Sequence, residues 1–241
     1  LLNRVPGVQI QQSGGRGSVT GVFIRGTKTA QTLVLIDGVR VGSVSAGGAT
    51  LQHLNLEQIE RVEVLRGSRS AVYGADAIGG VIQVFTRRSE GEGLQGRARV
   101  AVGNKGVRER SAGISGGDQD TRFNLSASLD EMAGFDRTTK ADSLSADHDA
   151  YRNKAVSFSL THAFNEQLTA GVNVLDQRGK TEYDNVFNQK PYDKFVVSTV
   201  STFAELQATE QWLSRLELGH SEDKSGTYDK ISDLRRDYNT Y

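Results

Sequence analysis

Segments in which apolar and polar residues alternate strictly fill most of the chain after about residue 94. Each runs for about ten residues and is bounded by polar turn residues. The segments are GRARVAVG, RFNLSASLDE, AVSFSLTHAF, LTAGVNVLDQ and QWLSRLELGHS. Successive side chains of a β-strand point to opposite sides, so this pattern predicts antiparallel strands with one apolar and one polar face.

The alternation fits two architectures. In a soluble sandwich the apolar face lies inward, whereas in an outer-membrane barrel it faces lipid and the polar face lines the lumen. The connections differ in length: Gly103 to Gly106 and Asn165-Glu166 are short, while Met132 to Ala150 and Gly179 to Asp193 are long and polar. Short turns on one side and long loops on the other favour the barrel.

The first part, Leu1 to about Arg88, has a mixed pattern that predicts a small α+β unit. The run LVLI, Leu33 to Ile36, is typical of a buried strand, and the Asp37-Gly38 pair after it predicts a tight hairpin. Residues 54–59 fit a short helix. Glu63 to Leu65 and Val81 to Phe85 fit further strands.

The stretch LRGSRSAVYGADAIGGVI, residues 65–82, is rich in glycine but does not fit a phosphate-binding loop. Residues 65–88 contain no lysine, and the β-like VIQVF follows where a helix would be needed. Val72, Tyr73, Ile78 and Val81 are spaced like packed residues. We therefore expect a tight, packed connection in which glycine and alanine allow close backbone approach.

Composition excludes several classes of function. The 29 basic and 29 acidic side chains balance, which argues against nucleic acid as the main partner. There is no cysteine, no apolar run of about 18 residues and no signal-peptide pattern at the start, and we expect the chain to be the interior of a longer protein. No catalytic motif surrounds His53, His148, His162 or His220, so we expect no enzyme. His162 and His220 fall on the predicted lipid-facing side.

Three segments across residues 5–88 resemble the plug domain of TonB-dependent outer-membrane transporters. They are PGVQIQQSGGRGSVTGVFIRG, LVLIDGVRV and IERVEVLRGSRSAVYGADAIGGVIQVFTRR. The resemblance implies an α+β plug over residues 1–90, truncated at its N-terminus. It implies that residues 91–241 are the first transmembrane antiparallel strands of an incomplete 22-stranded plugged barrel, truncated at its C-terminus.

Within that family the sequence is most similar to the branch that transports vitamin B12 (cobalamin), through FIRGT, LVLIDGVR, SAVYGADAIGGV and, more loosely, HSEDKSGTYD. The resemblance implies receptor-mediated transmembrane transport in the outer membrane of a Gram-negative bacterium. TonB–ExbB–ExbD and the proton-motive force would drive it, with lipid around the barrel and no covalent cofactor. A ferric-siderophore receptor of the same fold and a secreted β-rich adhesin remain alternatives.

The resemblance places the ligand on two plug loops rich in glycine and serine. Their expected contacts are Ser13, Arg16, Ser18, Ser43, Val44, Ser45 and Ala46. Position 18 holds serine where the cobalamin branch has a longer amide side chain, and the loop from Gly42 to Thr50 is about one residue shorter. Both departures leave the ligand open between cobalamin and a siderophore.

Two further groups of charged residues are candidates for function. Acidic residues in the long loops could bind calcium, which prefers six to eight oxygen ligands; they are Asp147, Asp149, Asp184 and Asp229. Charged residues beside the apolar plug strands are expected to form an ion-pair network between plug and barrel; they are Arg25, Asp37, Arg40, Glu63 and Arg66. Removing Arg66 or Glu63 alone is expected to leave an unpaired charge and to cost about 3–5 kcal/mol locally.

Overall fold

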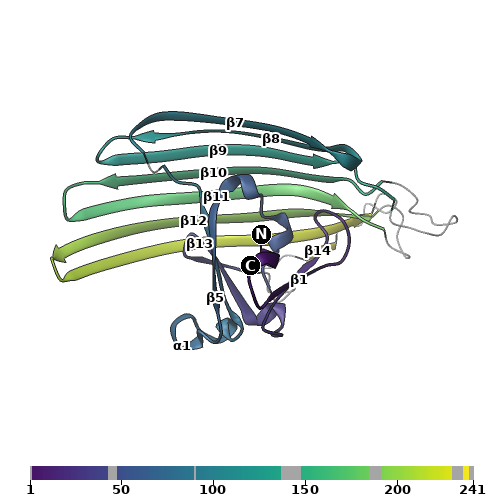
Figure 1. The fold of residues 1–241 in the computed structure, drawn as a ribbon, viewed down its shortest axis with the longest axis horizontal. Helices are drawn as coiled ribbons and strands as arrows, with labels where there is room; N and C mark the ends of the chain where they lie inside the picture. Colours follow the sequence, from purple (N-terminus) through teal and green to yellow (C-terminus); the bar gives the residue numbers. More distant parts are fainter. Residues whose placement is uncertain are drawn as a thin grey trace.

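The computed structural model describes residues 2–42, 48–89, 91–136, 148–184, 191–229 and 236–238. A long, curved antiparallel sheet forms one side of the molecule, and the N-terminal residues pack as a small unit against its concave face (Figure 1). Within these residues, no helix has the length and apolar character to cross a membrane.

The large sheet contains eight strands, each antiparallel to its neighbours and in the order β14-β13-β12-β11-β10-β9-β8-β7. The alternating segments all fall within it, which confirms the predicted antiparallel strands. Their bounds are β7 (Gly93–Gly103), β8 (Val107–Gly117), β9 (Thr121–Met132), β10 (Tyr151–Ala163), β11 (Leu168–Glu182), β12 (Pro191–Thr209), β13 (Trp212–Asp229) and β14 (Arg236–Tyr238).

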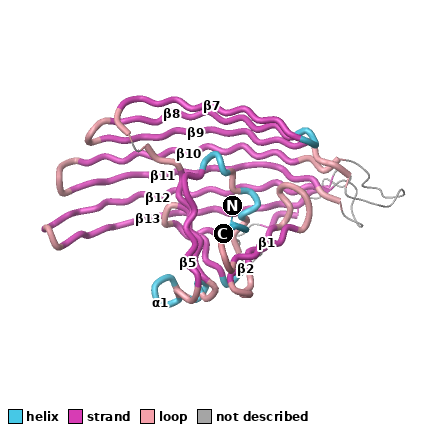
Figure 2. The backbone as a smooth tube through the Cα atoms, in the orientation of Figure 1, coloured by secondary structure: helices cyan, strands magenta, loops and turns pink. Residues whose placement is uncertain are grey.

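The connections of the sheet differ between its two ends, as Figure 2 shows. Residues 118–120, 164–167 and 210–211 form short turns at one end, and the described residues 133–136, 148–150 and 183–184, which belong to the longer connections, lie at the other. The turn η6 (Asn104–Gly106) was expected with the short turns but lies at the long-connection end, where Gly134 N donates to the Lys105 carbonyl at 3.1 Å. Strand direction decides this, because β7 and β8 meet at that end.

The N-terminal unit combines a mixed four-stranded sheet, ordered β4-β3-β6-β5, with a separate β1–β2 hairpin. β3 and β6 are parallel, and β5 and β4 are antiparallel to their neighbours. The elements are η1 (Leu2–Arg4), β1 (Val8–Gln12), β2 (Thr20–Ile24), η2 (Thr29–Gln31), β3 (Thr32–Ile36), β4 (Val39–Val41), η3 (Leu51–His53), η4 (Leu56–Gln58), β5 (Ile59–Arg66), α1 (Ser70–Tyr73), η5 (Ala75–Ala77) and β6 (Gly80–Thr86).

Local predictions for this unit are largely confirmed. Every residue of β3 is buried, and both Asp37 and Gly38 have positive φ, at 47° and 84°, as a two-residue hairpin turn requires. The helix expected over residues 54–59 is instead a single 3₁₀ turn, η4, which follows η3 and is capped by the Asn55 side chain accepting from Glu57 N.

The glycine-rich stretch is a packed connection, as expected, but of its four candidate core residues Val81 is buried, Tyr73 is half-buried and the other two are exposed. Ala77 is fully buried, while Val72 and Ile78 are 77% and 48% exposed. The stretch folds into α1 and η5, and this compact turn directs Val72 outward. Close approach does occur: a Cβ on Gly80 would meet the Leu65 carbonyl oxygen.

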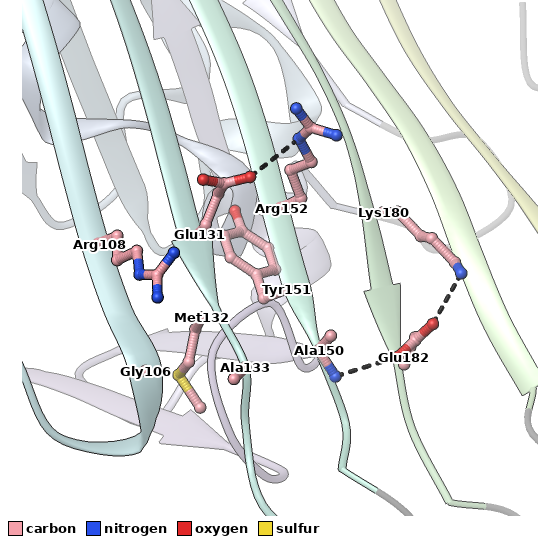
Figure 3. Close-up of a pocket in the computed structure, with 10 residues that line it drawn as sticks. All are labelled: Gly106, Arg108, Glu131, Met132, Ala133, Ala150, Tyr151, Arg152, Lys180 and Glu182. Carbon is pink, nitrogen blue, oxygen red and sulfur yellow. Dashed lines mark hydrogen bonds and ion pairs between the residues drawn. The ribbon is translucent and has the colours of Figure 1, made fainter.

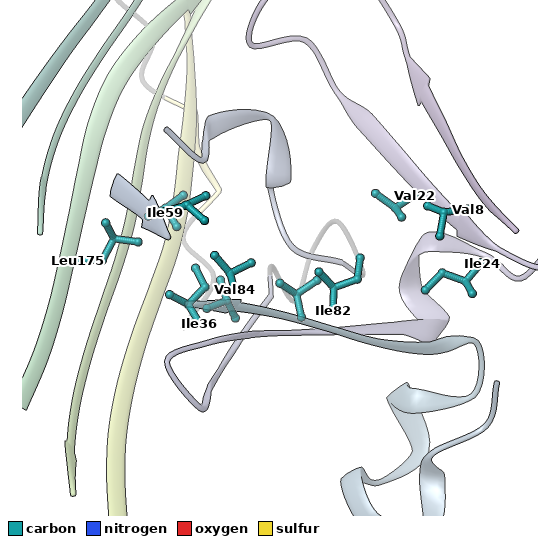
Figure 4. Packing of buried hydrophobic residues seen from close by; sticks show 11 residues of the cluster. Val8, Val22, Ile24, Ile36, Ile59, Ile82, Val84 and Leu175 are labelled. Carbon is teal, nitrogen blue, oxygen red and sulfur yellow. The ribbon is translucent and has the colours of Figure 1, made fainter. Parts of the chain in front are cut away.

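The main apolar core extends from the N-terminal unit to the large sheet. Ile36, Ile82 and Val84 form its centre, and Leu175 from β11 closes it on the sheet side (Figure 4). Val197 from β12 belongs to the same cluster. Because most other inward residues of the large sheet are polar, this apolar contact is a small part of the interface.

Candidate functional site

The loop between β1 and β2, Ser13–Val19, reaches the large sheet near its long-connection end; we call it the apex loop. Ser13 N donates to the Val19 carbonyl at 3.0 Å, which closes the loop. Gly17 has φ of 79°, and a Cβ there would lie 2.6 Å from Tyr151 Cε2 and 2.9 Å from Thr181 Oγ1. Glycine is therefore required for the loop to approach the inner face of the large sheet, which we call the wall.

Arg16 extends from the apex loop to two carboxylates of the wall. Its Nη2 lies 2.9 Å from Glu109 Oε1 and also pairs with Asp130, and its guanidinium is 5.9 Å from the centre of the Tyr151 ring. The Arg16 charge is compensated by protein groups before any ligand arrives.

The contacts of Arg16 continue into a larger network that links the N-terminal unit to the sheet. Arg99 Nη1 lies 2.8 Å from Glu109 Oε2 and 3.1 Å from Glu57 Oε1, so charges alternate in sign from Asp130 to Glu57. Arg16 and Glu57 come from the N-terminal unit, and the other three residues come from β7, β8 and β9. We call these five residues the interface ion network.

Neutral hydrogen bonds form most of the remaining contact with the sheet. Gln58 is fully buried; its Nε2 donates to Ser128 Oγ at 2.8 Å and its Oε1 accepts from Ser157 Oγ at 2.7 Å. Similar bonds join Asn55 N to Gln177, Ser221 to the Arg40 carbonyl and Asn124 to the Arg87 carbonyl, and Thr50 Oγ1 donates to the carboxyl group of Asp223.

His53 is a buried titratable group of this contact. Its ring stacks on Phe195 with centroids 3.5 Å apart, and its carbonyl accepts from Asn153 Nδ2 at 2.7 Å. Burial lowers the pKa of His53 to about 3, so the imidazole is neutral at physiological pH.

The network predicted from Arg25, Asp37, Arg40, Glu63 and Arg66 is wrong in its membership. Asp37 accepts from Thr86 Oγ1 at 2.6 Å and pairs with Arg88 at 3.3 Å, Arg40 pairs with Asp76, and Glu63 pairs with Arg61 at 2.8 Å. Arg66 donates to the Pro6 carbonyl, and no carboxylate among the described residues lies within salt-bridge distance of Arg25. These contacts all lie inside the N-terminal unit.

The large cost expected for removing Glu63 or Arg66 is also wrong. Both residues are exposed, and the carboxyl group of Glu63 pairs with the exposed Arg61. An exposed ion pair contributes about 0–1 kcal/mol, because water solvates either partner when the other is removed.

The other predicted site residues are only partly covered by the structure. Ser13, Arg16 and Ser18 lie in the apex loop, whereas Ser43, Val44, Ser45, Ala46 and Asp147 lie outside the described residues. Asp149 is buried beside the long connection after β9, Asp184 follows β11, and Asp229 ends β13. Among the described residues no three acidic or histidine side chains gather as metal ligands, and calcium stays a prediction.

Comparison with known proteins identifies the N-terminal unit. A family model described as "TonB-dependent Receptor Plug Domain" matches residues 1–81. The chain belongs to the TonB-dependent receptor family. The match places the plug in the N-terminal unit, and β7–β14 have the fold of the barrel strands of such receptors. A secreted adhesin is thereby set aside.

Relatives extend the similarity beyond the plug. The chain is 30% identical over 232 residues to the vitamin B12 transporter BtuB of Vibrio cholerae serotype O1, covering 95% of this chain and 38% of the relative. It is 34% identical over 248 residues to BtuB of Vibrio vulnificus strain CMCP6, covering 96% and 39%. The chain therefore spans less than two-fifths of the length of these curated relatives.

Solved structures share the fold of this receptor at lower identity. A mutant of the ferric enterobactin receptor PfeA of Pseudomonas aeruginosa aligns with a TM-score of 0.71 at 21% identity, covering 93% of this chain and 38% of that one. The ferripyoverdine receptor of Pseudomonas aeruginosa aligns with a TM-score of 0.76 at 14% identity, covering 97% and 33%.

Sequence reasoning missed most of the interface ion network of the receptor. Arg99 was placed on the polar face of its strand, and the same alternation marks Glu109 in VRERS and Asp130 in SASLDE as inward-facing. A charged residue at an inward position of a barrel strand was thus the sequence feature that could have indicated a contact with the plug. Its partner on the plug could not be read from the same pattern, because the plug contacts depend on three-dimensional packing.

Proposed function

We propose that this receptor, expressed from its complete gene, takes up cobalamin across the outer membrane of a Gram-negative bacterium. The TonB–ExbB–ExbD complex would drive uptake with energy from the proton-motive force. The observation that carries this proposal is the 30–34% identity to vitamin B12 transporters over 95–96% of the chain, across plug and barrel strands alike. The receptor performs no covalent chemistry in this scheme.

The ligand would bind between the apex loop and the loop that follows β4. Ser13, Arg16 and Ser18 would contribute from the first, and Ser43, Val44, Ser45 and Ala46 from the second. These residues offer hydroxyls and backbone amides with little bulk, which suits a large, amide-fringed ligand.

The electrostatics of the apex loop favour cobalamin over an anionic ferric siderophore. Arg16 already contacts Glu109 and Asp130. The interface ion network contains three carboxylates and only two guanidinium groups, so its negative groups outnumber its positive ones. A cation compensated in this way adds little attraction for a further anion. A siderophore receptor would need cations that remain available at the apex.

Calcium is proposed as a loop-ordering ion rather than a catalytic one. Asp147, Asp149, Asp184 and Asp229 would supply carboxylate oxygens from three connections at the same end of the barrel. If so, chelation should weaken ligand binding without unfolding the strands.

The plug contact is of a kind that force can break in steps. Its bonds to the wall are mainly neutral, such as those of Gln58 to Ser128 and Ser157, and water can replace each of them as it opens. A largely apolar contact would expose its whole surface to water at once. We propose that TonB pulling opens this polar contact and lets the ligand pass.

Equilibrium binding to the detergent-solubilised receptor tests the ligand. Cyanocobalamin should bind with nanomolar affinity in calcium and more weakly in chelator, and a ferric siderophore should not bind. Siderophore binding without cobalamin binding would overturn the ligand assignment. Equal cobalamin affinity in calcium and chelator would remove only the calcium proposal.

A matched glycine pair tests the position of the ligand. Gly17 and Gly26 have nearly equal φ, 79° and 80°, but a Cβ on Gly17 meets Tyr151 whereas a Cβ on Gly26 meets nothing within 4 Å. Gly17→Ala should displace the apex loop and weaken cobalamin binding at least tenfold. Gly26→Ala carries similar backbone strain and should leave the affinity unchanged; equal effects would contradict the apex site.

A further inference from the structure

The outward face of the barrel strands carries a band of apolar side chains. The strand register aligns Ile114, Leu125, Phe158, Val174 and Val200 in one row across β8–β12. Phe123, Leu160 and Val172 align in the next row toward the short turns. These rows match the lipid-facing belt of an outer-membrane barrel.

Toward the long connections the same face becomes cationic. One row across β8–β12 holds Arg108, Glu131, Arg152, Lys180 and Lys194. The adjacent row across β8–β13 holds Arg110, Leu129, Lys154, Arg178, Val196 and Lys224. We call these the outer cationic rows; they contain eight cations and one carboxylate.

The register places like charges directly opposite one another. Arg152 faces Lys180 across β10 and β11, and Lys180 faces Lys194 across β11 and β12. Lys154 faces Arg178 in the second row. Directly opposed like charges destabilise a sheet, so anionic groups outside these rows would stabilise this arrangement.

Nearby carboxylates compensate only part of this charge. Glu131 is shared between Arg110 and Arg152 at 3.6 and 3.3 Å, and Asp176, Glu182 and Glu222 pair with Arg178, Lys180 and Lys224. Four carboxylates therefore serve eight cations. Arg108, Lys154 and Lys194 have no described carboxylate within 4 Å.

The side chains leave room for a bound group. A hollow of about 370 Å³ lies at the ends of β8–β11, and its charged lining consists of Arg108, Arg152 and Lys180 with the carboxylates Glu131 and Glu182 (Figure 3). Beside it Tyr192 stacks on Tyr228 at 5.2 Å between ring centroids. Tyrosine is enriched where a membrane meets water, which sets the hollow at headgroup depth.

We propose that the outer cationic rows bind phosphate-bearing headgroups of the surrounding lipid leaflet. One row lies between the outer cationic rows and the apolar band, and it consists of Ala112, Ala127, Val156, Asp176, Ser198 and Glu222. A molecule with acyl chains and a phosphate group can span this row and contact both. Soluble phosphate would meet the cations but leave the apolar band unused. Bound headgroups would place anions between the opposed cations of β10, β11 and β12 and relieve their repulsion.

The test uses the receptor, expressed from its complete gene, in phosphatidylcholine bilayers with spin-labelled phosphatidic acid or spin-labelled phosphatidylcholine as probe. The motionally restricted signal gives the association constant of each probe with the protein. We expect selectivity for phosphatidic acid that declines as salt is raised. Lys154→Gln with Arg178→Gln should reduce the selectivity by roughly thirtyfold, because each cation near an anionic surface contributes roughly fivefold.

Two controls separate the proposal from general effects of charge and folding. Lys154→Arg with Arg178→Lys keeps both charges and should keep the selectivity. Lys28→Gln with Arg69→Gln removes two exposed plug cations and should also keep it. Equal affinity for both probes in the unmodified receptor, unchanged selectivity in the glutamine variant, or full displacement by millimolar inorganic phosphate would overturn lipid binding at these rows.

Discussion

Gly219 of β13 lies against the β3–β4 hairpin of the plug. A Cβ at this position would meet the side chain of Val39, with Cγ1 at 3.1 Å and the Val39 Cβ at 3.2 Å, and would meet Cγ2 closer still. Two residues along the strand, Ser221 Oγ donates to the Arg40 carbonyl at 2.7 Å and holds the hairpin there. Gly219→Ala should therefore force the hairpin away from β13.

The size of the effect follows from the atoms involved. Overpacking a well-filled contact by one methyl group costs about 1–3 kcal/mol. Val39→Ala alone removes two buried methyl groups and costs about 2 kcal/mol. In the double variant the new methyl group occupies the space that Val39 vacates, so the two costs should not add. We expect a coupling energy of about 1–2 kcal/mol in favour of the double variant.

Hydrogen exchange of the β3 and β4 amides in the detergent-solubilised receptor measures this local stability. Gly96→Ala is the matched control, because a Cβ there meets nothing within 4 Å, and it should leave exchange unchanged. Additive costs for Gly219→Ala and Val39→Ala would refute the reasoning. They would mean that the hairpin does not lie against β13.

Three further predictions concern the plug. The pKa of His53 is lowered by burial, so the unfolded state binds more protons below pH 6.5; the free energy of unfolding should fall by about 2 kcal/mol more between pH 7.5 and 5 than in His53→Phe. Gln58→Met leaves the Ser128 and Ser157 hydroxyls without their partner. The free energy of local opening, measured by hydrogen exchange, should fall by about 2 kcal/mol. Glu63→Gln should change thermal stability by less than about 1 kcal/mol, as measured by calorimetry.

Features that depend on neighbouring residues in the sequence could be predicted. Period-two alternation predicted β7, β9, β10, β11 and β13 and their two faces, and Asp37-Gly38 predicted its turn, because each is set by local backbone geometry. The family could be recognised because its plug motifs occur in order within 85 residues or so of continuous sequence.

Features that depend on packing could not be predicted. Charged residues beside plug strands were assigned to the barrel interface, yet Asp37 pairs with Arg88 inside the plug and Arg16 reaches Asp130 on the wall. Nothing in the spacing of these residues encodes which of them meet. Val72 shows the same limit, because an apolar residue in a compact turn can point outward when the turn itself fills the available space.

The strand register links the two faces of the barrel and is itself set by the short turns. Asp118 Oδ1 accepts from Asp120 N at 3.0 Å and Thr121 N at 2.6 Å, and Asn165 Oδ1 accepts from Gln167 N and Leu168 N. These backbone bonds lower the pKa of the Asp118 carboxyl, so it stays ionised as an acceptor at neutral pH.

A shift of one residue would exchange the faces of a strand. Ser157 would leave Gln58 for the lipid side, and Phe158 would enter the plug contact in its place. The same shift would turn Lys154 inward and break the outer cationic rows. The polar plug contact and the lipid-facing surface therefore depend on the same register, and the side chains of two short turns help to hold it.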